Sequence, residues 1–161
     1  MALRLDDYQN HHELLDKIRY INKFYYEPAA ENILYLEEND GALSIAFAIA
    51  LRDAYSHLAR IFEYEDILKP DNKIKIARQL ERYLGHLEEL LYDTYLKIIK
   101  KKSDELFTRL RKGDQPKIKM QLALRLQKVR TVDDNITIEQ RIHDFKEIIS
   151  FIEKIYSTYQ F

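Results

Sequence analysis

Apolar residues recur along most of this chain at the three- and four-residue spacing of amphipathic helices. The pattern predicts helices over residues 6–26, 29–39, 42–65, 72–112, 117–132 and 138–160. Pro and Gly mark two clear turns between them, at residues 69–72 and 113–116. We therefore expect an all-α fold, a bundle of five or six mostly antiparallel helices, in a single domain over residues 1–161.

Local signals predict where several of these helices begin. Asp6 suits the N-terminal end of the first helix, and Pro28 fits the first position of the second. Asn72 can cap the fourth helix. Thr137 followed by Gln140 is a capping-box pattern, which predicts the start of the last helix.

The helix over residues 42–65 is the most apolar, and we expect the rest of the chain to pack around it. Its first ten residues are apolar or small on every side, which is typical of a helix that is buried all round. Ile45 and Ile49 cover the side opposite its main core face. That main face comprises Leu43, Phe47, Ala50, Ala54, Leu58 and Ile61.

The second half of this helix carries the candidate chemistry. Arg52, Asp53 and His57 lie within two turns, and Asp53 and His57 share a face. In an antiparallel hairpin centred on the first turn, facing residue numbers sum to about 141, so His57 faces residues 84–86 and Arg52 faces 88–90. The predicted cluster joins Arg52, Asp53 and His57 to Arg82, His86, Glu89 and Asp93.

Two interpretations of this cluster remain open. Two imidazoles near carboxylates can be tuned as a general acid and a general base. Alternatively, the cluster is a structural polar network, in which Glu89 is the carboxylate that a buried Arg52 requires.

The run Arg52-Asp53-x3-His57 resembles the Arg-polar-x3-His signature of HEPN domains, the higher-eukaryote and prokaryote nucleotide-binding superfamily. The resemblance implies a small helical bundle that pairs as a homodimer, with two motifs across a cleft, and cleaves RNA without a metal. Arg52 would hold the scissile phosphate, His57 would act on the attacking 2′-hydroxyl or the leaving oxygen, and Asp53 would orient them. Independently, a His and an Arg can supply the proton transfer and the cation that such cleavage needs.

The net charge of −1 hides a strong asymmetry. Residues 97–130 hold twelve Lys or Arg and only three Asp or Glu. These cations could follow a phosphate backbone, or they could form a solvated helix face. The candidate nucleic-acid ligands are Lys100, Lys101, Lys102, Arg109, Arg111 and Lys112, followed by Lys117, Lys119, Arg125, Lys128 and Arg130.

Composition excludes several other classes of protein. There is no Cys, no apolar run of about 18 residues and no signal-like N-terminal stretch, so we expect a cytoplasmic protein without a membrane span. Adjacent His11 and His12 diverge on a helix, and Glu139, His143 and Glu147 fit a solvated face better than a metal site. We expect no metal and no cofactor.

These patterns lead to two hypotheses of different class. The first is an RNA-directed protein, in its enzymatic form a metal-independent endoribonuclease of a toxin or phage-defence module, with a homodimeric structure and an antitoxin as protein partner. The second is a non-catalytic helical interaction or scaffold protein whose polar cluster is structural.

Overall fold

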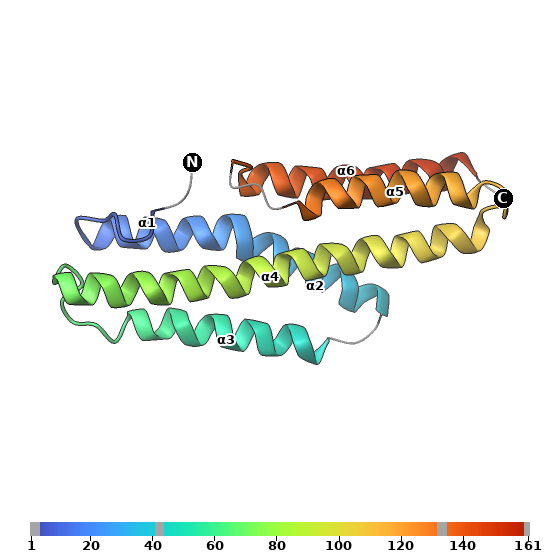
Figure 1. The fold of residues 1–161 in the computed structure, drawn as a ribbon. Coiled ribbons are helices and arrows are strands. Elements are labelled where there is room, and N and C mark those ends of the chain that lie inside the picture. Colours follow the sequence, from blue (N-terminus) through green and yellow to red (C-terminus); the bar gives the residue numbers. More distant parts are fainter. Residues whose placement is uncertain (1–3, 41–43, 132–134, 160–161) are drawn as a thin grey trace. The chain divides into compact units, whose positions relative to one another are not determined.

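The computed structural model describes residues 4–40, 44–131 and 135–159, and all regular elements within them are helical (Figure 1). The all-α prediction is confirmed. The elements are α1 (His11–Ile21), the π-helical segment η1 (Asn22–Tyr26), α2 (Glu27–Asp40), α3 (Ile45–Ile61), α4 (Pro70–Arg109), α5 (Gln115–Arg130) and α6 (Ile138–Thr158). Because α1, η1 and α2 follow one another without a break, the described residues form five helical rods.

The chain divides into two compact units. The N-terminal unit extends to Thr94, and the C-terminal unit begins at Tyr95. Helix α4 contributes its first part to one unit and its last part to the other. That the whole chain behaves as a single domain stays a prediction.

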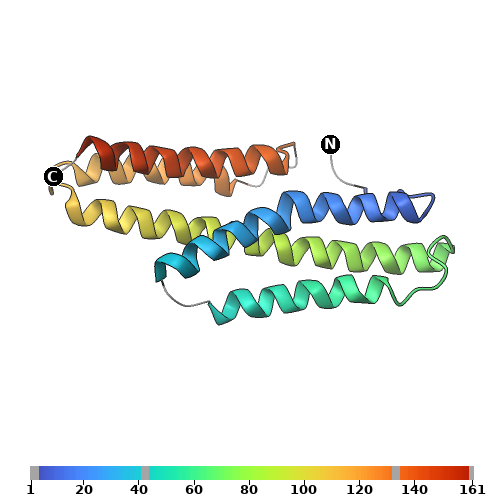
Figure 2. The same ribbon diagram turned by 180° about the vertical axis from the view of Figure 1, so that it is seen from behind.

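In the N-terminal unit, α3 and the first part of α4 form an antiparallel hairpin, and α1 also lies alongside α4 (Figures 1 and 2). Tyr8 is fully buried and donates a hydrogen bond from its hydroxyl to the Ile67 carbonyl at 3.0 Å. Each large apolar side chain buried here contributes about 1.5–3 kcal/mol. The core comprises Leu5, Tyr8, Leu14, Ile18, Ile21, Ala54, Ile61, Ile67, Ile76, Leu80, Tyr83 and Leu87.

The sequence predicts that Pro28 begins a new helix, and that prediction is wrong. Pro28 lies inside a continuous helix. A proline ring in a helix clashes with the carbonyl four residues earlier and provides no N–H. The backbone immediately before Pro28 widens into η1, where the Glu27 N–H bonds the Asn22 carbonyl five residues back. This π-helical turn accommodates the proline without ending the helix.

Helix α3 is not buried all round, and that prediction is wrong. Phe47, Ala54 and Ile61 are buried, whereas Ile45 and Ile49 are 78% and 44% exposed. A helix needs neighbours on several sides to be buried, and the composition of α3 does not reveal how many it has. Leu43, which we assigned to its core face, lies outside the described residues.

The C-terminal unit pairs α5 with α6 beside the end of α4. Tyr95 of α4 stacks on Phe145 of α6, with ring centroids 4.8 Å apart and an interplanar angle of 6°. Arg141 of α6 is buried and donates to the carbonyls of Val129 and Thr131 at 2.5 and 2.9 Å. These two bonds satisfy carbonyls at the C-terminal end of α5 that the helix leaves unpaired.

Two predicted helix starts need correction. Helix α1 begins at His11, because the Asn10 side chain accepts from the Glu13 N–H at 2.9 Å, whereas Asp6 lies outside the helix. Helix α4 already begins at Pro70, and Asn72 does not cap it. Instead, the Asn72 amide donates to the Asp66 carbonyl at 2.7 Å.

The capping prediction for α6 is confirmed, since the Thr137 hydroxyl accepts from the Gln140 N–H at 3.2 Å. Across the described segments, none of the helices combines the length and the apolar character needed to cross a membrane.

Candidate functional site

Helix α3 places an ion pair at the surface of the N-terminal unit. Arg52 Nε and Nη2 donate to Asp53 Oδ1 at 3.0 and 2.8 Å. The two side chains are 73% and 39% exposed, so the pair contributes little to stability. Asp53 shares a helix face with His57, and the Arg52 guanidinium that binds Asp53 stays open to solvent.

His57 turns toward α4 and is half-buried. Its Nδ1 lies 2.8 Å from Oε1 of Gln79. An amide oxygen only accepts, so Nδ1 carries the proton and Nε2 of the neutral ring carries the lone pair. The bond therefore selects the tautomer in which Nε2 can accept a proton.

A second imidazole lies against the first. The ring of His86 stacks on that of His57, with centroids 5.3 Å apart and planes inclined by 12°. This contact confirms the predicted register, in which His57 faces residues 84–86. Sequence reasoning missed Gln79, although it precedes His86 by seven residues and so lies on the same face of α4 two turns earlier.

The predicted contact between Arg52 and Glu89 does not form among the described residues, because Arg52 pairs with its own neighbour Asp53. Arg82 and Glu89 are exposed. Partial burial, and then the nearby Glu89, raise the pKa of the Asp93 carboxyl. The structure thus brings together His57 and His86, and among the described residues Arg52 pairs with Asp53 and not with Arg82, Glu89 or Asp93.

Three tyrosines join the motif to the π-helical turn. Tyr55 of α3 packs edge-on against Tyr26 of η1, with centroids 5.9 Å apart. Burial, followed by a hydrogen bond with Tyr26, raises the pKa of Tyr55. Burial, and then Tyr26, raise the pKa of Tyr83 to about 12, and the Tyr83 hydroxyl donates to the Asn22 side chain. The contact between Tyr55 and Tyr26 fixes α3 beside η1.

Most of the candidate nucleic-acid ligands on α4 already have partners. Three lysines meet acidic side chains: Lys100 with Asp104 at 2.8 Å, Lys101 with Glu105 at 3.9 Å, and Lys102 with Glu153 at 2.9 Å. Arg109 lies over the Tyr156 ring at 4.8 Å. Arg111 and Lys112 are exposed just before α5.

Helix α5 is the less neutralised part of the basic segment. It holds five Lys or Arg and no Asp or Glu. Lys119 and Arg125 lie over the rings of Phe107 and Phe151, which leaves their charge intact. Lys117, Lys128 and Arg130 are exposed.

In the parts of the chain that the structure describes, no group of three His, Asp or Glu side chains could hold a metal ion. On α6, His143 lies 4.0 Å from Glu147 and both are well exposed. His11 and His12 are exposed on α1.

Comparison of the chain with protein-family models, with curated proteins and with solved structures gives no match. The functional argument therefore depends on the geometry of these residues.

Proposed function

We propose that this chain is an RNA-directed protein with an HEPN-like bundle, and that the seam between α3 and α4 cleaves RNA without a metal. The observation that carries the proposal is the bond between His57 and Gln79, since it presents Nε2 as a proton acceptor. Arg52 adds a solvent-accessible cation about 7.5 Å away along the helix axis.

The chemistry requires three groups. Nε2 of His57 takes the proton from the ribose 2′-hydroxyl, whose oxygen attacks the adjacent phosphorus. The Arg52 guanidinium stabilises the charge on the phosphorane, and Asp53 positions it. The P–O5′ bond then breaks and the 5′ oxygen receives a proton, which gives a 2′,3′-cyclic phosphate and a 5′-hydroxyl.

In a homodimer, a second copy supplies the proton donor for the leaving oxygen. A second copy that faces this surface of α3 brings a second Arg52 and a second His57 to the same cleft, and that second imidazole, when it carries a proton on Nε2 as well as on Nδ1, donates the Nε2 proton to the 5′ oxygen. Exposed Ile45 and Ile49, on the same helix, supply apolar area for such a contact. Within the C-terminal unit, the exposed Lys117 and Lys128 of α5 would attract the phosphates of a nucleic acid.

The alternative is a non-catalytic interaction module, and the same exposed Ile45 and Ile49 favour it. In that case a different protein covers α3, and the pair of His57 with His86 serves only to fix the α3–α4 register. In a toxin or phage-defence module, an antitoxin would be a partner of this kind.

Cleavage of a structured RNA in EDTA distinguishes these functions. We expect Arg52→Ala and His57→Ala to lower the cleavage rate by about 100-fold or more while the protein stays folded. Arg60→Ala on the same helix and His143→Ala on α6 are the matched controls, and they should cleave at the wild-type rate. Equal rates in all variants, or no cleavage by the wild type, would exclude the nuclease.

A further inference from the structure

The C-terminal unit contains a groove between α4 and α5 that the proposed cleavage does not use. Its volume is about 460 Å³, which is within the range of small-molecule sites. Leu96 and Ile99 of α4 and Leu122 and Leu126 of α5 form its apolar part. Leu96 and Leu126 are only half-buried, so a ligand can reach apolar surface there.

The buried polar side chain that lines this groove already has a hydrogen-bond partner. Ser103, which also lines it, donates its hydroxyl to the Ile99 carbonyl at 2.6 Å. Among the described residues that are not exposed, all buried side-chain nitrogen and oxygen atoms have hydrogen-bond partners. A ligand on this floor therefore needs an apolar body more than hydrogen-bonding groups.

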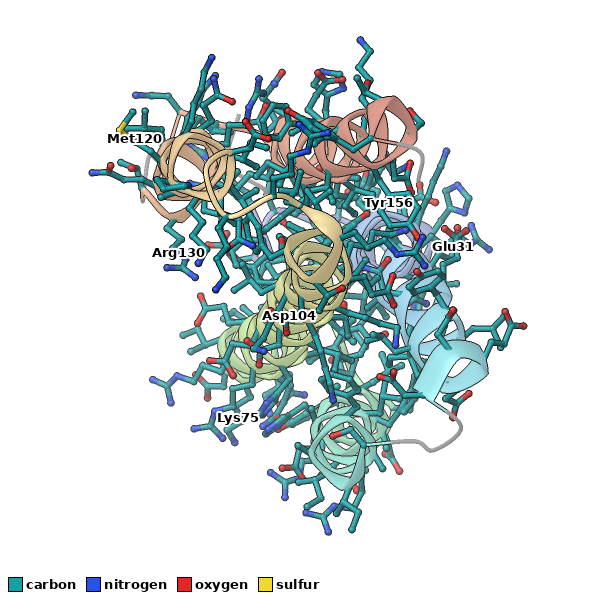
Figure 3. All side chains as sticks on the ribbon, turned by 90° about the vertical axis from the view of Figure 1, so that its right-hand side faces the viewer. Glu31, Lys75, Asp104, Met120, Arg130 and Tyr156 are labelled. Atoms are coloured by element: carbon teal, nitrogen blue, oxygen red, sulfur yellow. The ribbon has the colours of Figure 1, made fainter. Side chains whose placement is uncertain are left out.

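The rim of the groove is basic. Arg130 is exposed at the last turn of α5, and Figure 3 shows that it leaves this helix in a different direction from the outward-pointing Met120. Lys97 and Lys100 line the α4 side. The one carboxylate on the rim, Asp104, is held by Lys100 at 2.8 Å. An anionic group is thus favoured at the rim and a cationic one is not.

We propose that this groove binds a single-chain amphiphile with an anionic head group, such as a fatty-acid carboxylate. The chain lies on Leu96, Ile99, Leu122 and Leu126, and the carboxylate accepts hydrogen bonds from the Arg130 guanidinium. Nucleic acid fits the groove less well, because none of its lining residues is aromatic and could stack on a base. The proposal does not depend on the nuclease activity.

Calorimetric titration with decanoate below its micellar concentration tests this site. We expect saturable binding of one decanoate per chain, at least tenfold weaker binding of decanol, and no binding of decyltrimethylammonium. Arg130→Gln should weaken decanoate binding by about tenfold or more, since it removes a charge-assisted bond. Lys128→Gln, which removes the same charge from the neighbouring surface of α5, should bind like the wild type.

Leu126→Gln tests the apolar part of the groove, with thermal unfolding as the check on its folding. Binding that is equal in Arg130→Gln and Lys128→Gln would overturn the proposal even if Leu126→Gln fails to fold. Vesicles of an anionic phospholipid form a separate arm of the experiment. Binding to those vesicles without binding of free decanoate would also overturn the proposed binding site, because it would reflect charge attraction by the whole basic surface.

Discussion

Gln79 decides the chemistry that His57 can perform, because its amide oxygen holds the proton on Nδ1. We predict that ¹⁵N NMR at neutral pH finds His57 as the Nδ1–H tautomer in the wild type. In Gln79→Leu the ring should populate both tautomers and RNA cleavage should fall, while the α3–α4 stack persists. Glu81→Leu, at an exposed position of α4, is the control, and an unchanged tautomer in Gln79→Leu would contradict the assignment.

Arg141 stabilises the C-terminal unit through hydrogen bonds to the carbonyls of the buried Val129 and the exposed Thr131. We expect Arg141→Ala to lower the free energy of unfolding by about 2–4 kcal/mol, measured by denaturant titration. Lys146→Ala, at an exposed position of the same helix, should change it by less than about 0.5 kcal/mol. Similar small effects in both variants would mean that water replaces the guanidinium.

Alkaline pH should weaken the N-terminal unit through Tyr83. Its pKa is about 12 in the folded chain, above the ordinary value of 10.0, so the folded state holds the phenol proton more tightly than the unfolded state does. This contribution is fully present below pH 10 and is lost as the pH rises toward 12. Between pH 10 and pH 12, the free energy of unfolding of the wild type should fall by about 1–3 kcal/mol more than that of Tyr83→Phe. Unfolding titrations of both proteins across this pH range measure the difference. Identical pH profiles for the two proteins would contradict a buried phenol.

At the scale of elements, α3 has both buried and exposed apolar residues, and substitutions at each kind should differ in their effect on stability. We expect Phe47→Ala to cost about 3–5 kcal/mol of unfolding free energy, because Phe47 belongs to the core face. In the isolated monomer, Ile45→Ser should cost less than about 0.5 kcal/mol, because that side chain is 78% exposed there. A large loss of stability in the monomeric Ile45→Ser protein would contradict the exposure of this side of α3.

The sequence predicts the elements well, since helical periodicity depends on neighbours within the same helix. It also predicts that His86 meets His57, because the turn before α4 sets the register of the hairpin. Sequence-based prediction fails at residues for which two local structures are possible. We expected a buried Arg52 to need Glu89, but Arg52 is 73% exposed and pairs with adjacent Asp53, so no partner on α4 is required. Pro28 could begin a helix, but the π-helical turn before it lets the helix continue through it.

At the scale of the whole chain, α4 is the only described helix that contributes to both compact units. Because a helix forms cooperatively along its length, melting one half of α4 frays the other half, so we predict that the chain unfolds in one cooperative transition. Differential scanning calorimetry should therefore give equal calorimetric and van't Hoff enthalpies. Two separated transitions would instead identify the units as independent domains.

The central claim is that the seam between His57 and its α4 partners cleaves RNA through the ribose 2′-hydroxyl. The most direct measurement is the chemical identity of the RNA ends made by the purified protein in EDTA. Our account predicts 2′,3′-cyclic phosphate and 5′-hydroxyl ends from the wild type, and neither from His57→Ala. Intact RNA from both proteins, or the same ends from both, would contradict it.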